Sequence, residues 1–120
     1  MAVSVSTFLM RCALSLCLFL PALPAMAQGK ECAVVLMHGK GGTAQRTGFF
    51  GRKLEPYCTV KSIEMPWSKR RNYDDPYSVA LNEIAAQVKE FRDQGYARVL
   101  VAGHSFGANA AMAYMAQVGD

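Results

Sequence analysis

The sequence contains few of the residues that usually bind metals or cofactors. It has two histidines and four cysteines in 120 residues, and no two cysteines have the Cys-x-x-Cys spacing of a zinc or redox site. It also lacks a Walker A loop and a Gly-x-Gly-x-x-Gly turn, the usual phosphate-binding motifs. The sequence therefore predicts no metal and no other cofactor.

The composition is neither highly charged nor excessively hydrophobic. Apolar residues make up 52% of the chain and charged residues 18%, which excludes the composition of a disordered protein. The same composition is too polar for a protein with several membrane spans. No internal repeat is present, and a length of 120 residues leaves room for one small domain.

Acidic residues are missing from the first 27 positions. Arg11 is the only charged side chain there, and a short apolar run at 12–20 is followed by the small-x-small sequence 25–27. These features predict a secretory signal peptide at 1–27, cleaved before Gln28, and a mature domain at 28–120. The mature protein would then be exported to the periplasm or the extracellular space, without a stable membrane anchor. The alternative is an uncleaved amino-terminal anchor.

Removal of the signal peptide leaves 93 residues, a formal charge of +3 and two cysteines, Cys32 and Cys58. In an exported protein an even pair of cysteines is a disulfide candidate. Metal binding together with His38 is the alternative.

The mature sequence alternates between strand and helix patterns. Apolar runs at 33–37 and 97–102 are typical of strands buried in a parallel sheet, and 59–65 forms a further strand pattern. Such alternation predicts an α/β fold with a mostly parallel three-stranded sheet flanked by helices. The segment 40–42 is expected to form a tight turn between the first strand and the first helix.

Three helices are expected between and after these strands. The first covers 44–54 and would pack through Phe49, Phe50 and Leu54. The second would be capped by Asp75, with Pro76 at its first position, and would end at Gly95. Its apolar spacing indicates one buried face. The third helix covers 108–118 and is rich in small residues.

The turn before the last helix carries the chemical signal. Gly103, Ser105 and Gly107 form a Gly-x-Ser-x-Gly sequence between a strand pattern and a helix pattern, as a nucleophile elbow requires. Such a serine adopts a positive φ on a sharp turn and exposes its hydroxyl. The next N–H, of Phe106, lies at a helix amino terminus, which favours a developing negative charge. The alternative is an ordinary turn with a capping serine.

The sequence His38-Gly39-Lys40-Gly41-Gly42 follows the first mature strand, 67 residues before the elbow serine. Together with the elbow, it resembles the amino-terminal half of an α/β-hydrolase, and the resemblance covers nearly all of the mature chain. It implies Ser105 as the nucleophile and the N–H groups of Phe106 and Lys40 as the oxyanion hole. Gly39, Gly103 and Gly107 would be the loop and elbow glycines.

The resemblance also implies roles for the remaining candidates. His38 would brace its loop, and His104 would be packed or orienting rather than serve as the base. The first mature strand would lie between the other two. Cys32 and Cys58 would then begin adjacent strands, within disulfide reach.

The catalytic set of an α/β-hydrolase is incomplete in this sequence. The family order places the acid and then the histidine after the serine, but Asp120 is the only acid after Ser105 and no histidine follows. We expect the sequence to be the front half of a longer hydrolase, and we expect the chain by itself to be inactive. The alternative is a non-catalytic exported remnant or binding module.

The expected partner of this protein is a small-molecule or acyl substrate. The basic run 69–71 lies beside aromatic residues and could contact an anion, but three charges in a loop are usually solvated. We therefore expect no binding of nucleic acid. The oligomeric state cannot be read from the sequence.

Overall fold

A computed structural model describes residues 31–118 of the chain, so the predicted signal peptide and Asp120 lie outside the described residues. The element order is β1 (Cys32–Met37), α1 (Ala44–Leu54), β2 (Thr59–Ile63), α2 (Tyr77–Asp93), β3 (Arg98–Gly103) and α3 (Phe106–Gln117). This order confirms the predicted alternation.

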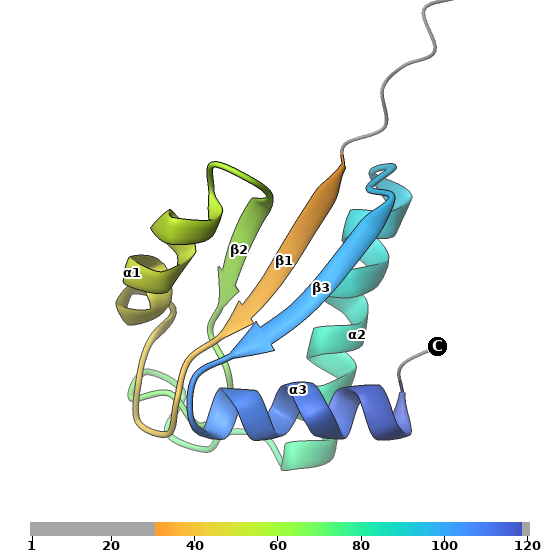
Figure 1. Ribbon diagram of the computed structural model, residues 1–120. Coiled ribbons are helices and arrows are strands. Elements are labelled where there is room, and N and C mark those ends of the chain that lie inside the picture. Colours follow the sequence, from red (N-terminus) through yellow and green to blue (C-terminus); the bar gives the residue numbers. More distant parts are fainter. Residues whose placement is uncertain (1–30, 119–120) are drawn as a thin grey trace, which may run out of the picture.

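The three strands form one parallel sheet in the order β2-β1-β3, with β1 in the centre (Figure 1). In the register, Ala33 lies opposite Thr59 on one side and Val99 on the other. Helix α1 packs on one face, against β2 and β1, while α2 and α3 pack together on the other face. The predicted fold class and central strand are therefore confirmed. All three strands point their carboxyl ends toward the start of α3.

The main core lies between the sheet and the pair α2 and α3. Alternate residues of β1, namely Ala33, Val35 and Met37, point into it and are fully buried. From α2 it receives Ile84 and Phe91, at helical spacing. Every residue of β1 is buried, as the continuous apolar run predicts.

The prediction that 97–102 forms a buried strand is wrong in part. Strand β3 is an edge strand, and α1 covers only the β1 and β2 side of the opposite face. Leu100 is therefore 51% exposed, although its neighbours pack toward α2 and α3. The strand predicted at 59–65 also ends earlier, at Ile63.

The packing expected for α1 is wrong as well. Phe49 and Phe50 are 59% and 48% exposed, and the buried residues of the helix are Thr47 and Gly51. A Cβ built on Gly51 would lie 3.4 Å from Val60 Cγ1 and 3.7 Å from Leu36 Cδ2. The helix therefore approaches the sheet through a glycine, and the two phenylalanines face away from that contact.

The ends of α2 correct one detail and confirm another. Pro76 is the N-cap and Tyr77 the first helical residue, so Asp75 does not cap the helix. Gly95 has φ +86° and its N–H donates to the carbonyl of Arg92. It therefore closes the helix as predicted, in a conformation that favours glycine.

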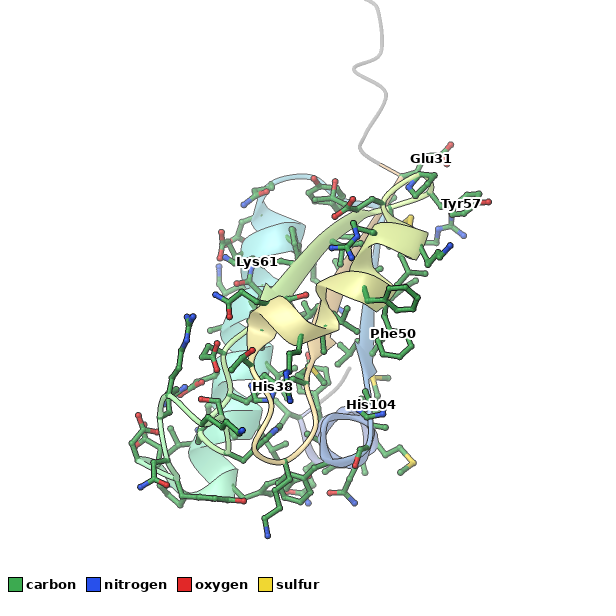
Figure 2. The ribbon with its side chains drawn as sticks, turned by 90° about the vertical axis from the view of Figure 1, so that its left-hand side faces the viewer. Glu31, His38, Phe50, Tyr57, Lys61 and His104 are labelled. Atoms are coloured by element: carbon green, nitrogen blue, oxygen red, sulfur yellow. A yellow bond between two sulfur atoms is a disulfide. The ribbon has the colours of Figure 1, made fainter. Side chains whose placement is uncertain are left out.

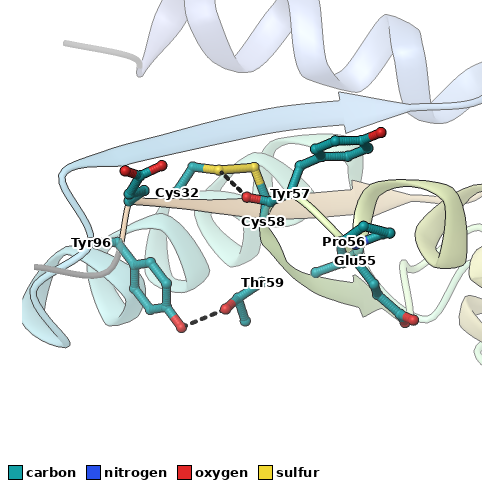
Figure 3. A pocket seen from close by; sticks show the side chains of 9 residues that line it. Cys32, Glu55, Pro56, Tyr57, Cys58, Thr59 and Tyr96 are labelled. Atoms are coloured by element: carbon teal, nitrogen blue, oxygen red, sulfur yellow. Dashed lines mark hydrogen bonds between the residues drawn. A yellow bond between two sulfur atoms is a disulfide. The ribbon is translucent and has the colours of Figure 1, made fainter.

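A disulfide joins Cys32 to Cys58, with the two Cα atoms 4.9 Å apart (Figure 3). It connects the first residue of β1 to the residue before β2, at the amino ends of the strands. Beside it, the hydroxyl of Tyr96 donates to Thr59 Oγ1 at 2.8 Å. The expected pairing of the two cysteines is therefore found in the structure.

We expect reduction of the Cys32–Cys58 disulfide to lower the free energy of unfolding by about 3 kcal/mol. In the chain-entropy model, opening a cross-link between residues 26 apart releases the unfolded chain and favours it. Urea unfolding of oxidised and reduced protein measures the difference. Two free thiols, found by alkylation of protein purified from an oxidising compartment, would contradict the disulfide.

Candidate nucleophile elbow

Ser105 connects β3 to α3 in a left-handed backbone conformation. Its φ is +53° and its ψ −118°, values that a serine rarely adopts. The residue is exposed and stands at the N-cap position, yet its side chain makes no capping hydrogen bond. The structure therefore does not support the alternative of an ordinary capping serine. The hydroxyl is left available at the turn.

The positions of the two elbow glycines leave no room for a Cβ atom. A Cβ on Gly103 would lie 2.2 Å from the carbonyl carbon of Gly107, and a Cβ on Gly107 would lie 2.6 Å from the carbonyl oxygen of Met37. These atoms belong to the backbone and cannot move aside as a flexible side chain could. The start of α3 thus sits directly on the ends of β1 and β3, and any larger residue would separate them.

The loop after β1 packs against the elbow from the other side. A Cβ on Gly39 would lie 3.2 Å from Ser105 Cβ and 3.2 Å from His104 Nδ1. The N–H of Gly42 donates to the carbonyl of Gly39, which closes the predicted tight turn. The N–H of Gly41 donates to the carbonyl of Trp67, so the turn is also attached to the loop after β2.

The N–H groups of Phe106 and Lys40 are the two predicted donors to an oxyanion. Phe106 begins α3, where the first N–H groups have no partner within the helix. Within residues 31–118, neither Phe106 nor Lys40 donates its N–H to a backbone carbonyl outside the helices and strands. The first turn of α3 also contains no acidic side chain, so nothing there offsets the positive end of the helix dipole.

His38 braces the site, as the resemblance implies. It is 1% exposed, and its Nδ1 lies 2.8 Å from the carbonyl oxygen of Gly39. Its Nε2 accepts the N–H of Met65 at 3.0 Å, which assigns the proton to Nδ1. The indole N–H of Trp67 donates to the carbonyl of His38. With both ring nitrogens occupied, His38 cannot also serve Ser105.

The other histidine, His104, lies at the surface next to Ser105. Its ring stacks on that of Phe50, with centroids 5.7 Å apart and planes 19° apart (Figure 2). It is exposed rather than packed in the core. Among the hydrogen bonds of the described residues, none joins a histidine to Ser105.

Glu64 lies at the end of β2, on the far side of His38. Burial opposes its ionisation, but the N–H of Ala44, which donates to Oε2 at 3.1 Å, and the side chain of Ser68, with a smaller contribution from the charge of Arg70, outweigh burial and lower the pKa of Glu64. Its Oε1 lies 3.7 Å from His38 Nε2. The carboxylate therefore anchors the amino terminus of α1 beside His38, but Oε1 makes no hydrogen bond to the histidine.

A cavity of about 300 Å³ opens beside the elbow, at the carboxyl ends of the strands. Open α/β sheets usually bind ligands at this edge. Lys40 and Arg46 contribute the charges, and no carboxylate lines it. The full lining is His38, Gly39, Lys40, Gly41, Gly42, Arg46, Thr47, Phe50, His104 and Ser105.

A larger cavity, of about 470 Å³, lies at the opposite end of the sheet (Figure 3). It surrounds the disulfide and is lined by residues such as Glu31, Tyr57 and Tyr96. None of the elbow or loop residues contributes to it. Size alone therefore does not identify the site, and the cavity that contains Ser105 is the candidate.

The structure brings together all the predicted site residues except the cysteines, which lie at the other end of the sheet.

Sequence reasoning missed Arg71, which was expected to be solvated. Its guanidinium pairs with Asp74, Asp75 and Glu83 at 2.7–2.9 Å. These hydrogen bonds raise its pKa further above the ordinary value for arginine. The sequence signal for this network was the presence of acidic residues three, four and twelve positions after Arg71.

Two negative findings concern only residues 31–118. No group of three or more metal-ligating side chains occurs there, and none of the helices described is both long and apolar enough to cross a membrane.

We expect Gly107→Ala to lower the free energy of unfolding by about 1–3 kcal/mol or more, because the new methyl group would push α3 off the end of β1. Gly48→Ala is the matched control. Its Cβ would meet only the end of the Arg52 side chain, at 3.7 Å, and alanine favours the helix by up to about 1 kcal/mol. Urea unfolding of both variants measures the difference, and equal stabilities would contradict the close approach.

Comparison with protein-family models, with curated proteins and with solved structures found no match for this chain. The geometry of the elbow and the sequence motif that forms it are therefore what indicates a function for this protein.

Proposed function

We propose that this protein is a serine hydrolase of the α/β-hydrolase type, with Ser105 as its nucleophile. The substrate would be an ester, thioester or amide, cleaved through an acyl-serine intermediate. The observation that carries the proposal is the backbone of Ser105, whose strained turn exposes a hydroxyl that caps nothing. Strain of this kind persists where the surrounding structure over-determines it, and it is common at active sites.

The proposed reaction begins when Ser105 Oγ attacks the carbonyl carbon of the substrate. The carbonyl oxygen becomes an oxyanion, which the N–H groups of Phe106 and Lys40 would stabilise. Collapse of this intermediate breaks the bond to the leaving group and leaves an acyl ester on Ser105. Water then attacks the acyl ester and regenerates the hydroxyl.

The reaction also requires a base that takes the proton of Ser105 and returns it to the leaving group. His38 is occupied at both nitrogens, and no hydrogen bond joins His104 to Ser105. The proposal therefore requires an acid and a base from outside residues 31–118. If no such residues complete the site, the alternative of a non-catalytic binding module is favoured.

We also propose that the protein is exported. The Cys32–Cys58 disulfide supports export, because disulfides persist mainly in oxidising compartments. The acid-free segment at 1–27 supports it independently through its resemblance to a signal peptide. The partner we propose is a small acyl substrate.

We expect the thiol introduced by Ser105→Cys to have a pKa at least about one unit below the usual 8.5, because the amino end of α3 stabilises a thiolate. The rate of alkylation by iodoacetamide, measured against pH and assigned to each cysteine by mass spectrometry, reports this pKa. Asn82→Cys is the control, since residue 82 is exposed in the middle of α2. Identical pH profiles for the two thiols would contradict an anion-stabilising elbow.

The 120-residue chain should hydrolyse p-nitrophenyl esters no faster than its Ser105→Ala variant. Without a base in contact, the serine hydroxyl remains a weak nucleophile. Release of p-nitrophenol, measured for both proteins at equal concentration, provides the comparison. A clear rate that depends on Ser105 would show that the chain already contains the base.

A further inference from the structure

A second cavity, of about 190 Å³, lies next to the elbow and takes no part in the mechanism above. Of its six lining residues four carry aromatic rings, and one of these four, Phe106, directly follows the nucleophile. We call this cavity the aromatic pocket, and its lining is Pro66, Trp67, Tyr73, Asp75, Tyr77 and Phe106.

Three of the rings pack against one another. The ring of Phe106 meets Trp67 edge to face, with centroids 4.9 Å apart, and lies 5.6 Å from Tyr77. The polar groups of the other two rings are already bonded. The indole N–H of Trp67 donates to the carbonyl of His38, and the hydroxyl of Tyr77 donates to Asn109 Oδ1 at 2.7 Å. Ring carbons are therefore the surface left for a ligand.

Tyr73 holds the fourth ring at the mouth of the pocket by means of a strained backbone. Asn72 and Tyr73 both have left-handed φ values, +47° and +60°, which is unusual for a tyrosine. The N–H of Tyr73 donates to the carbonyl of Pro66 at 2.7 Å, which fixes the turn. The residue nevertheless remains 53% exposed, so its burial does not explain the strain. An observed strain of this kind suggests a functional role.

The charges around the pocket disfavour a cationic ligand. Asp75 is the only acid in the lining, and its Oδ2 pairs with the guanidinium of Arg71 at 2.9 Å. The ammonium of Lys40 lies 5.9 Å from the centre of the Tyr73 ring. A cation at that ring would therefore meet Lys40, while the one carboxylate is already neutralised.

We propose that the aromatic pocket binds an uncharged, single-ring aromatic group of the substrate, of phenyl or benzyl size. An apolar cavity of about 150 Å³ is known to hold benzene, so 190 Å³ accommodates one ring and a short link. Aromatic walls add edge-to-face attraction that an aliphatic ring would not obtain. The assignment of this ring to the substrate rests on the proposed function, in which Ser105 is the nucleophile. Phe106 directly follows Ser105, and consecutive Cα atoms are only about 3.8 Å apart, so the pocket lies beside the reacting group.

Trp67 is the only tryptophan in the sequence, so its fluorescence reports directly on the pocket. We expect benzyl alcohol to change the emission of the full chain saturably, with a dissociation constant on the order of 1 mM. Cyclohexylmethanol has a similar shape without a π system and should bind about 2- to 10-fold more weakly. Benzylammonium should also bind more weakly than benzyl alcohol, because Lys40 repels it.

Two substitutions distinguish the pocket from unspecific contact. Tyr73→Ala should weaken binding of benzyl alcohol several-fold, and because it removes an exposed, strained residue the fold should persist, as near-ultraviolet circular dichroism can verify. Tyr57→Ala is the matched control, since Tyr57 is 79% exposed and lies at the opposite end of the sheet. Equal binding of the two alcohols, tighter binding of benzylammonium, or no effect of Tyr73→Ala would each overturn the proposal.

The ring site and the nucleophile can fail separately. Ser105→Ala should bind benzyl alcohol as tightly as the unchanged chain, because Ser105 does not line the aromatic pocket. Binding without a lowered thiol pKa in Ser105→Cys would support the pocket and contradict the hydrolase. A lowered thiol pKa without saturable binding would support the elbow and contradict the aromatic specificity.

Discussion

The contact between the first turn of α3 and the end of β1 constrains the whole carboxyl edge of the sheet. Gly107 lies against the carbonyl groups of Met37 and His38 with no room for a Cβ. Since α3 begins at this point, the chain leaving β3 must turn within two residues, and Ser105 has to adopt its positive φ. The position of the candidate nucleophile thus follows from backbone packing. It does not depend on a side-chain contact made by the serine itself.

His38 extends this constraint to the neighbouring loops. Its backbone carbonyl accepts the indole N–H of Trp67, its Nε2 accepts the N–H of Met65, and its Nδ1 bonds to the carbonyl of Gly39. One buried side chain thereby joins the loop after β1 to the loop after β2. His38 also lines the elbow cavity, and its carbonyl holds Trp67, which lines the aromatic pocket, so one residue fixes a part of each.

Arg71 gives the loop after β2 its second anchor. It holds Asp74, Asp75 and Glu83 together and donates to the carbonyl of Glu64 at 3.1 Å. A loop between a strand and a helix, rich in charge and exposed at several positions, is thereby given one conformation. That conformation includes the strained Tyr73, which would otherwise relax.

Much of the fold could be predicted because its signals are local. The apolar run of β1, the helical spacing of α2 and the Gly-x-Ser-x-Gly turn each specify their structure within a few residues. Two predictions depended on neighbours in space, and these were wrong or incomplete. Phe49 and Phe50 were expected inside, but Gly51 makes the contact with the sheet. Leu100 was expected to be buried, but none of the helices within residues 31–118 covers that face of β3.

The sequence by itself determined the order of the elements, the parallel sheet and the serine at the sharp turn, because periodicity and glycine spacing act along the chain. Only the tertiary structure decided which side chains stand around that serine. The tertiary fold occupies both nitrogens of His38 and stacks His104 on Phe50. It also gathers four rings, including that of Phe106, from the loop after β2 and from α2 and α3. Contacts of this kind join residues far apart in sequence, and hydrogen-bond geometry and close packing, rather than local pattern, select them.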